Sequence, residues 1–173
     1  NVLNNNTEIY FPTEFLHGLY DGGLGAGLDD YWNLMLSKPL AAGGFLWVFA
    51  DEGVVRRDLN DSIDTNGNSA PDGILGPYHE KEGSFYSIRE IWSPICFKES
   101  AITPDFNGKF TITNRFLYSN LKLSKFSYEL VKYGTGFPKM DIQRLTGTIQ
   151  SPDIAVGSIG SLDLNLPADW KSF

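Results

Sequence analysis

The run Gly43-Gly44-Phe45-Leu46-Trp47-Val48-Phe49-Ala50 is uninterrupted by charge and ends in Asp51-Glu52. Such a run is typical of a parallel strand that is buried on both faces. An earlier extended run, residues 8–13, is closed by Glu14, and His17 follows three positions later. Active sites of parallel α/β barrels lie at the carboxyl ends of the strands. This order of elements therefore predicts a barrel-like α/β region in which Glu14 has a chemical role.

Two segments have the residue spacing of amphipathic helices. The first, residues 28–36, has acidic residues near its start and is ended by Pro39. The second begins at Ser84, a favourable N-cap residue, and is closed by Pro94. Their apolar positions are Leu28, Tyr31, Trp32 and Met35 in the first helix, and Phe85, Ile88, Ile91 and Trp92 in the second. Between the two helices, the turn-rich residues 58–77 predict a long surface loop.

From Ser93 onward the apolar pattern changes to period two, which is typical of half-buried strands. Turn signals separate four strand candidates, at residues 109–116, 125–133, 141–150 and 161–166. Strands at this spacing predict an antiparallel β-sandwich. Residues 93–173 are fewer than the roughly 100 residues of an immunoglobulin-like domain, so we expect a strand or two to be missing.

Length, charge and cysteine content limit the classes of function. The 173 residues are too few for a complete eight-stranded barrel of about 250 residues. The net charge of −7 disfavours a nucleic-acid partner. No apolar run approaches the roughly 18 residues of a membrane span, so we expect a soluble chain that is processed or cut from a longer one. Cys96 is the single cysteine, which excludes an internal disulfide and leaves the compartment open between periplasm, exterior and cytoplasm.

Several motifs occur in a fixed order: Pro12-Thr13-Glu14-Phe15-Leu16-His17, Tyr31-Trp32, Gly43-Gly44-Phe45-Leu46-Trp47 and Asp51-Glu52-Gly53. Together they resemble the last strands of the catalytic barrel in glycoside hydrolase family 2, in particular its β-galactosidases. Residues 72–77 and 84–92 resemble the exit from that barrel. Asn114-Arg115-Phe116 resembles part of the sandwich that follows it.

The resemblance implies a retaining glycosidase in which Glu14 is the catalytic nucleophile. It also implies that His17, Trp47 and Asp51 bind the sugar, with Trp47 as an aromatic wall. The sequence departs from the β-galactosidase pattern at Tyr20-Asp21, where Gly-Asn is usual, and at Val48, where Asp is common. These departures leave the identity of the sugar open.

The second carboxylate of such an enzyme is not in this chain. Retaining glycosidases use two carboxyl groups roughly 5–5.5 Å apart. In the family the acid/base Glu follows an Asn on an earlier strand, and no Asn-Glu pair occurs here. The resemblance thus implies a C-terminal part of a (β/α)8 TIM barrel at residues 1–92. An incomplete immunoglobulin-like β-sandwich would follow at residues 93–173, and the chain alone would be inactive.

Partners and cofactors follow from the same resemblance. We expect a carbohydrate substrate and the rest of the same enzyme chain as partners, and homo-oligomerisation stays open. No cofactor is implied for this chain, and a divalent cation belongs at most to the full-length enzyme. Residues 58–68 offer the oxygen ligands Asp61, Asp64, Asn66 and Asn68, but without the spacing of an EF-hand loop, and a solvated turn explains them.

Simpler structural roles remain alternatives for every site residue. Glu14 could form an ion pair, His17 a loop hydrogen bond, Trp47 a core contact and Asp51 a turn cap. Glu80 and Glu82 are read as surface charges, and His79 as exposed. At the level of the whole chain, the alternative is a non-catalytic carbohydrate-binding or scaffold module whose functional part is the sandwich.

Overall fold

The computed structural model describes residues 7–18, 26–65, 71–134 and 143–172. The chain divides into two compact units, Asn1–Trp92 and Ser93–Phe173, called here the first and the second unit. Within the described residues, none of the helices has the length and apolar character needed to cross a membrane. That these units are a barrel end and a sandwich domain remains a prediction.

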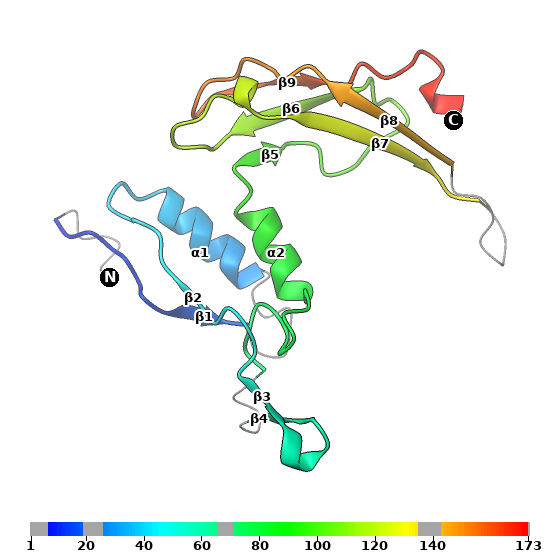
Figure 1. Ribbon diagram of the computed structural model, residues 1–173. Helices are drawn as coiled ribbons and strands as arrows, with labels where there is room; N and C mark the ends of the chain where they lie inside the picture. The colour runs from blue at the N-terminus through cyan, green and yellow to red at the C-terminus, as the bar shows by residue number, and fades with distance from the viewer. Residues whose placement is uncertain (1–6, 19–25, 66–70, 135–142, 173) are drawn as a thin grey trace. The chain divides into compact units, whose positions relative to one another are not determined.

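The first unit contains a β-α-β arrangement of parallel strands (Figure 1). Strand β1 (Phe15–His17) and strand β2 (Leu46–Trp47) pair in parallel, and helix α1 (Ala26–Leu36) connects them. A further extended segment, residues 72–75, runs parallel to the chain just after β2. There Ile74 N donates to Val48 O at 2.8 Å, and Leu75 N donates to Phe49 O at 3.1 Å.

Helices α1 and α2 (Gly83–Ile91) lie beside each other and complete a small core (Figure 1). This core consists of Phe15, Leu28 and Ile88, with partly buried residues such as Trp92 around it. The predicted helix at residues 28–36 is confirmed, and Leu28 and Met35 on its apolar face are buried. The second helix begins at Gly83 rather than after Ser84. The backbone is already extended at Glu82, the actual N-cap, and Ser84 is buried.

The prediction of a long strand buried on both faces over residues 43–50 is wrong. Only Leu46–Trp47 forms strand β2, and the side chains of Phe45 and Phe49 are 59% and 65% exposed. Both lie at the ends of this short strand, where they pack against surface rings. Phe45 contacts Phe11 and Phe49 contacts His79. The apolar run at residues 43–50 is therefore not buried on both faces.

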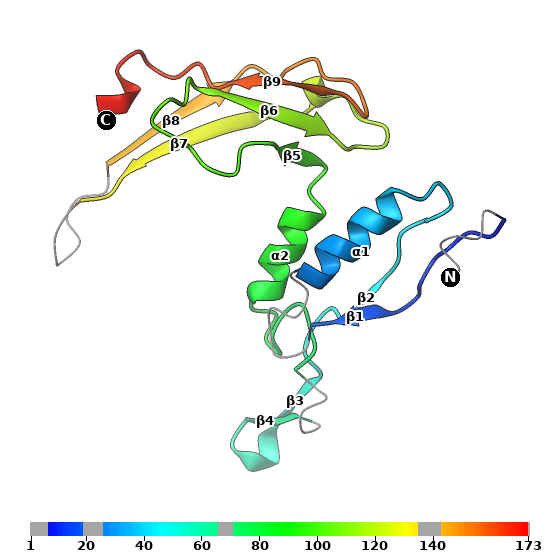
Figure 2. The ribbon, with the colours of Figure 1, turned by 180° about the vertical axis from the view of Figure 1, so that it is seen from behind.

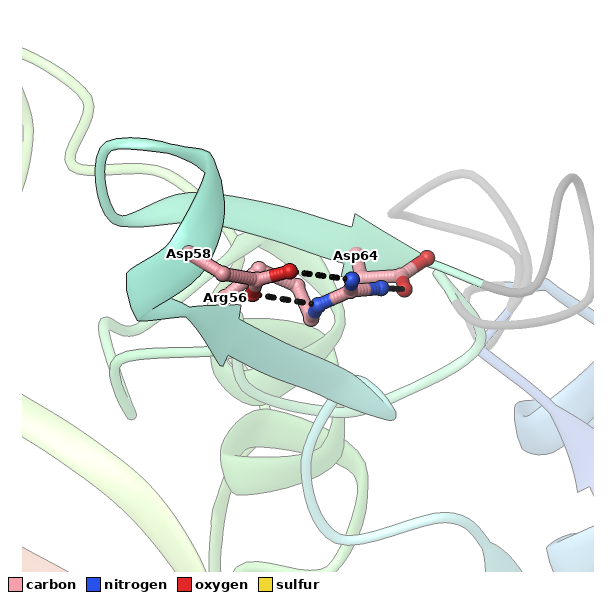
Figure 3. Close-up of polar contacts among 3 residues, drawn as sticks. All are labelled: Arg56, Asp58 and Asp64. Atoms are coloured by element: carbon pink, nitrogen blue, oxygen red, sulfur yellow. Dashed lines mark hydrogen bonds and ion pairs between the residues drawn. The ribbon is translucent and has the colours of Figure 1, made fainter.

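A β-hairpin replaces part of the predicted loop at residues 58–77. Strand β3 (Gly53–Arg56) and strand β4 (Ser62–Thr65) pair antiparallel, with a 3-10 turn (Arg57–Leu59) between them. Arg56 fixes the hairpin, as Figure 3 shows: its guanidinium donates to Asp58 at 2.8 and 2.6 Å and to Asp64 at 2.7 Å. These bonds raise the pKa of Arg56 and lower that of Asp58.

The second unit has two antiparallel sheets (Figure 2). The first sheet has the order β5-β6-β9, and the second pairs β7 with β8. The strands are β5 (Ile95–Phe97), β6 (Lys109–Asn114), β7 (Phe126–Lys132), β8 (Gln143–Ile149) and β9 (Ile159–Asp163), with 3-10 turns at Leu121–Leu123 and Trp170–Ser172. Both sheets contribute to one core that includes Ile112, Ile149 and Leu162, which is consistent with a β-sandwich.

The period-two pattern predicted β6, β7, β8 and β9 but not the short strand β5. Strands β6 and β7 fall within the predicted ranges 109–116 and 125–133, whereas β9 begins two residues earlier than predicted and ends at Asp163. Strand β8 lies within the range 141–150, of which residues 141 and 142 are outside the described residues.

Candidate active site

A bulge in strand β1 brings Glu14 and His17 together. In a regular strand, residues three apart point to opposite faces. Here Phe15 pairs with Leu46 and His17 with Trp47, so Leu16 is the extra residue, and its backbone is left-handed with φ 54°. Such a bulge redirects the side chains that follow it. As a result, His17 Nε2 lies 3.3 Å from Glu14 Oε1.

The sequence predicts that Glu14 closes its strand, but in the structure the extended segment continues past it. The segment that contains Glu14 pairs with the segment around β2. The pairing begins at Tyr10, which bridges to Ala41, and extends to Gly18, whose N–H donates to Trp47 O at 3.2 Å. Glu14 lies in a bend of this extended segment, directly before β1. Its side chain is about half exposed, so a ligand can reach the carboxylate.

Asp72 is the residue of this cluster that the sequence did not reveal. Its Oδ2 lies 3.2 Å from His17 Nδ1, on the opposite side of the ring from Glu14. The Asp72 side chain is buried, and its Oδ1 has no hydrogen-bond partner among the described residues. The sequence signal was weak, because Asp72-Gly73 reads as a turn and lies 55 positions from His17.

Asp51 belongs to the same network through the main chain. Its Oδ1 accepts the Gly73 N–H at 2.8 Å. The carbonyl oxygen of Asp72 accepts two further N–H groups, from Gly18 at 3.0 Å and from Val48 at 3.2 Å. These bonds tie the Asp72-Gly73 turn to β1 and to the chain after β2. Asp51 thus supports the turn that carries Asp72.

Two glycines allow this close approach of three main-chain segments. A Cβ atom on Gly18 would collide with the carbonyl oxygens of Asp72 and Gly73. One on Gly73 would collide with the backbone of Ala50 and Asp51. A residue with a side chain at either position would therefore push the segments apart.

Trp47 is the β2 residue that pairs with His17. The two rings are 6.3 Å apart between centroids and tilted by 45°. The indole is neither fully buried nor fully exposed, and the peptide bond that follows it, to Val48, is cis. His17 is therefore a neighbour of Glu14, Trp47 and Asp72, and Asp51 is connected to it through the turn that carries Asp72.

A tyrosine pair supports the segment that carries Glu14. The hydroxyls of Tyr10 and Tyr31 form a short hydrogen bond, and Tyr31 stacks on Phe15 at 5.1 Å. The bond to Tyr10, and secondarily burial, raises the pKa of Tyr31 to about 12. Tyr31 therefore stays neutral near pH 7 and serves here as a support for β1.

The other charged residues that the sequence singled out lie apart from this cluster. Within the described residues, no group of three or more His, Cys, Asp or Glu side chains could hold a metal ion. Of the candidate calcium ligands, Asp64 is paired with Arg56, and Asn66 and Asn68 lie outside the described residues. Glu80 accepts the Tyr78 N–H at 2.8 Å, and His79 is exposed.

A polar pocket of about 440 Å³ lies in the second unit. Its lining residues are Gln150, Ser151, Pro152, Asp153, Ser161, Asp163 and Asn165. Both carboxylates already have partners: Asp153 accepts from Asn120 at 2.7 Å and Asp163 pairs with Lys109 at 2.9 Å. The backbone N–H of Asn165 and the Lys109 ammonium hold the pKa of Asp163 below its usual range.

Comparison with known proteins agrees with the motif pattern at a coarse level. The chain is similar to a β-galactosidase. It is 24% identical over 145 residues to the β-galactosidase of Priestia megaterium (strain DSM 319 / IMG 1521), a match that covers 77% of this chain. The chain spans 13% of the length of that relative. No family model matches the sequence. The similarity supports a glycosidase-like relationship.

Proposed function

We propose that this chain is part of a retaining β-glycosidase of the glycoside hydrolase family 2 type, with Glu14 as the nucleophile. The observation that carries the proposal is the placement of Glu14: it is half exposed and lies 3.3 Å from His17, whose ring neighbours that of Trp47. The similarity to a much larger β-galactosidase supports it. The substrate would be a terminal β-linked sugar, and the rest of the enzyme chain would complete the site.

The first unit would be the C-terminal part of a (β/α)8 barrel. Three observations support this: β1 and β2 are parallel, α1 connects them, and residues 72–75 continue the parallel pairing before α2. Strands followed by helices in this order are the repeating unit of such barrels. The second unit would be the start of the β-sandwich domain that follows.

In the proposed mechanism, the Glu14 carboxylate attacks the anomeric carbon and forms a glycosyl ester as the bond to the leaving oxygen breaks. A second carboxyl group protonates that oxygen and then takes a proton from the water that hydrolyses the ester, which frees Glu14. Asp72 does not fit this second role, because it is buried behind His17. We infer that the acid/base Glu lies outside this chain, because no Asn-Glu pair occurs in it.

The roles of the surrounding residues follow from their positions. His17 would bind the sugar through Nε2, which lies 3.3 Å from Glu14 Oε1. Trp47 offers an apolar ring face against which a sugar can stack. Asp51 acts through Gly73, by holding the turn that carries Asp72, and this is a less direct role than sugar binding.

The decisive experiment is Glu14→Gln in the longer protein that carries this chain. We expect turnover of an aryl β-glycoside to fall by about 10⁴-fold or more, because the nucleophile is lost while the shape is kept. A 2-deoxy-2-fluoro glycoside with a good leaving group should label Glu14 in the unmodified protein, as detected by peptide mass spectrometry. Near-normal activity of the variant, or labelling of another residue, would refute the assignment.

The second candidate is a carbohydrate-binding module, favoured by the 440 Å³ polar pocket of the second unit. The described residues that line the pocket include no aromatic side chain, although aromatic faces are the usual platform for sugars. This candidate gains support if Glu14→Gln leaves activity unchanged while Asp153→Ala, in the pocket, abolishes sugar binding.

A further inference from the structure

His17 lies between two carboxylates in very different surroundings. The Glu14 side chain is 51% exposed, whereas that of Asp72 is 7% exposed. Water can therefore solvate Glu14 but reaches Asp72 poorly. Because Oδ1 of Asp72 has no partner among the described residues, its Oδ2 depends on His17 Nδ1 for a side-chain hydrogen bond.

This asymmetry decides which ring nitrogen holds the proton. A neutral imidazole carries one N–H, so it can donate to only one of the two carboxylates. A buried carboxylate without a donor costs more free energy than an exposed one, which water compensates. The proton of neutral His17 therefore belongs on Nδ1, facing Asp72, and the lone pair belongs on Nε2, facing Glu14.

We propose that Asp72 is a positioning residue that fixes His17 in the tautomer with the proton on Nδ1. The proposal rests on the proposed function only for its consequence: Nε2 then accepts a hydrogen bond from a sugar hydroxyl bound beside Glu14. In the other tautomer Nε2 would be a donor, so the hydroxyl would have to accept and would compete for this N–H with the Glu14 carboxylate 3.3 Å away. Asp72 itself touches neither the sugar nor the reacting atoms.

The main chain gives Asp72 the rigidity that such a role needs. Its carbonyl oxygen accepts from Gly18 and Val48, and the next N–H donates to Asp51. Gly18 directly follows His17, so the ring and its partner are fixed to the same junction. A second-layer partner held in this way orients a histidine and selects its tautomer.

The test uses Asp72→Asn, which keeps the shape but replaces the carboxylate by an amide that can either accept or donate. In protein labelled with ¹⁵N-histidine, the nitrogen chemical shifts report the tautomer, and His17→Gln identifies the His17 signals. We expect the Nδ1–H tautomer in the unmodified protein and a large shift of population toward the Nε2–H tautomer in Asp72→Asn. Exposed His79 serves as an internal reference.

Asp64→Asn is the matched control, because it removes a carboxylate from the exposed hairpin of the same unit. It should leave the His17 signals unchanged. An Nε2–H tautomer in the unmodified protein, or an unchanged tautomer in Asp72→Asn, overturns the proposal. Loss of the fold in Asp72→Asn also overturns it, since Asp72 would then serve stability.

Activity separates this proposal from the one it rests on. We expect Asp72→Asn to lower kcat/KM roughly ten- to a hundredfold, the range seen when an outer partner of a metal-bound histidine is lost. If Glu14→Gln keeps its activity, the glycosidase assignment fails, but the tautomer result stands on its own. If Glu14→Gln is inactive while the tautomer in Asp72→Asn is unchanged, only the role of Asp72 fails.

Discussion

Each of the two units buries a polar side chain, and the two are satisfied very differently. In the second unit, fully buried Asn114 donates to Ser119 O at 2.9 Å and to Ile154 O at 3.0 Å, and it accepts from Phe116 N at 3.0 Å. In the first unit, Asp72 has His17 as its side-chain partner, and its Oδ1 has none among the residues that the structure describes. A fully satisfied buried group stabilises a fold, whereas a half-satisfied one costs stability and calls for a functional reason.

The cores of the units differ in the same direction. Among the described residues of the second unit, seven buried apolar side chains, from strands of both sheets and from the segments between strands, form one cluster. The cluster in the described part of the first unit has three, and large apolar side chains such as Phe45 and Phe49 are exposed there. Burial of apolar area is the main source of folding free energy. We therefore expect the core of the second unit to contribute more folding free energy than the core of the first. The candidate site thus lies on the weaker support of the first unit.

The largest effect on stability should come from Asn114→Ala. This change leaves the Ser119 carbonyl oxygen and the Phe116 N–H without the Asn114 partner, and Ile154 O keeps only the Leu121 N–H. Each buried unsatisfied group costs about 1–3 kcal/mol. We expect the second unit to lose about 2–5 kcal/mol, measured by denaturant unfolding and by hydrogen exchange of β6 and β9. The same substitution at exposed Asn107 should cost less than about 1 kcal/mol. Equal losses of stability at Asn114 and Asn107 would show that the buried hydrogen bonds of Asn114 do not stabilise the second unit, and the contrast with Asp72 would fail.

An intermediate effect is expected from Gly73→Ala in the first unit. The added methyl group collides with the backbone of Ala50 and Asp51, and overpacking of this kind costs about 1–3 kcal/mol. The turn that carries Asp72 should move, so the His17 nitrogen shifts should change together with stability. Gly27→Ala is the control, since nothing lies near its Cβ position at the start of α1 and alanine favours helix by up to about 1 kcal/mol. A neutral Gly73→Ala would show that the junction is not tightly packed.

Local patterns in the sequence predicted the regular elements of both units. The helical spacing of Leu28 and Met35 gave α1, and the period-two runs gave the strands of the second unit. These patterns succeed because one face of each element is buried against a core. The same reasoning failed for the run at residues 43–50, since apolar character alone does not show whether both faces are covered.

The site was predictable only in part. The motif order singled out Glu14, His17, Trp47 and Asp51, and the structure brings these residues into one neighbourhood, although their roles remain predictions. Asp72 was missed because its contact with His17 joins residues far apart in sequence. The bulge at Leu16 was also invisible, because a left-handed backbone at leucine has no signal in residue type.

The smallest effect should come from the β3–β4 hairpin, which tests whether the first unit has a locally stabilised part away from its site. Arg56 lowers the pKa of Asp58, so the hairpin bond is retained above the ordinary Asp value of 3.8 and is lost as the pH falls below it. We expect the amide protection factors of β3 and β4, which correct for the intrinsic pH dependence of exchange, to fall below that pH. At neutral pH, Arg56→Gln should lower the same protection factors and leave the His17 signals unchanged. The neighbouring substitution Arg57→Gln should leave the exchange as it was. If Arg56→Gln altered His17 as well, the hairpin would be coupled to the site, and the weak support of the first unit would extend through all of it.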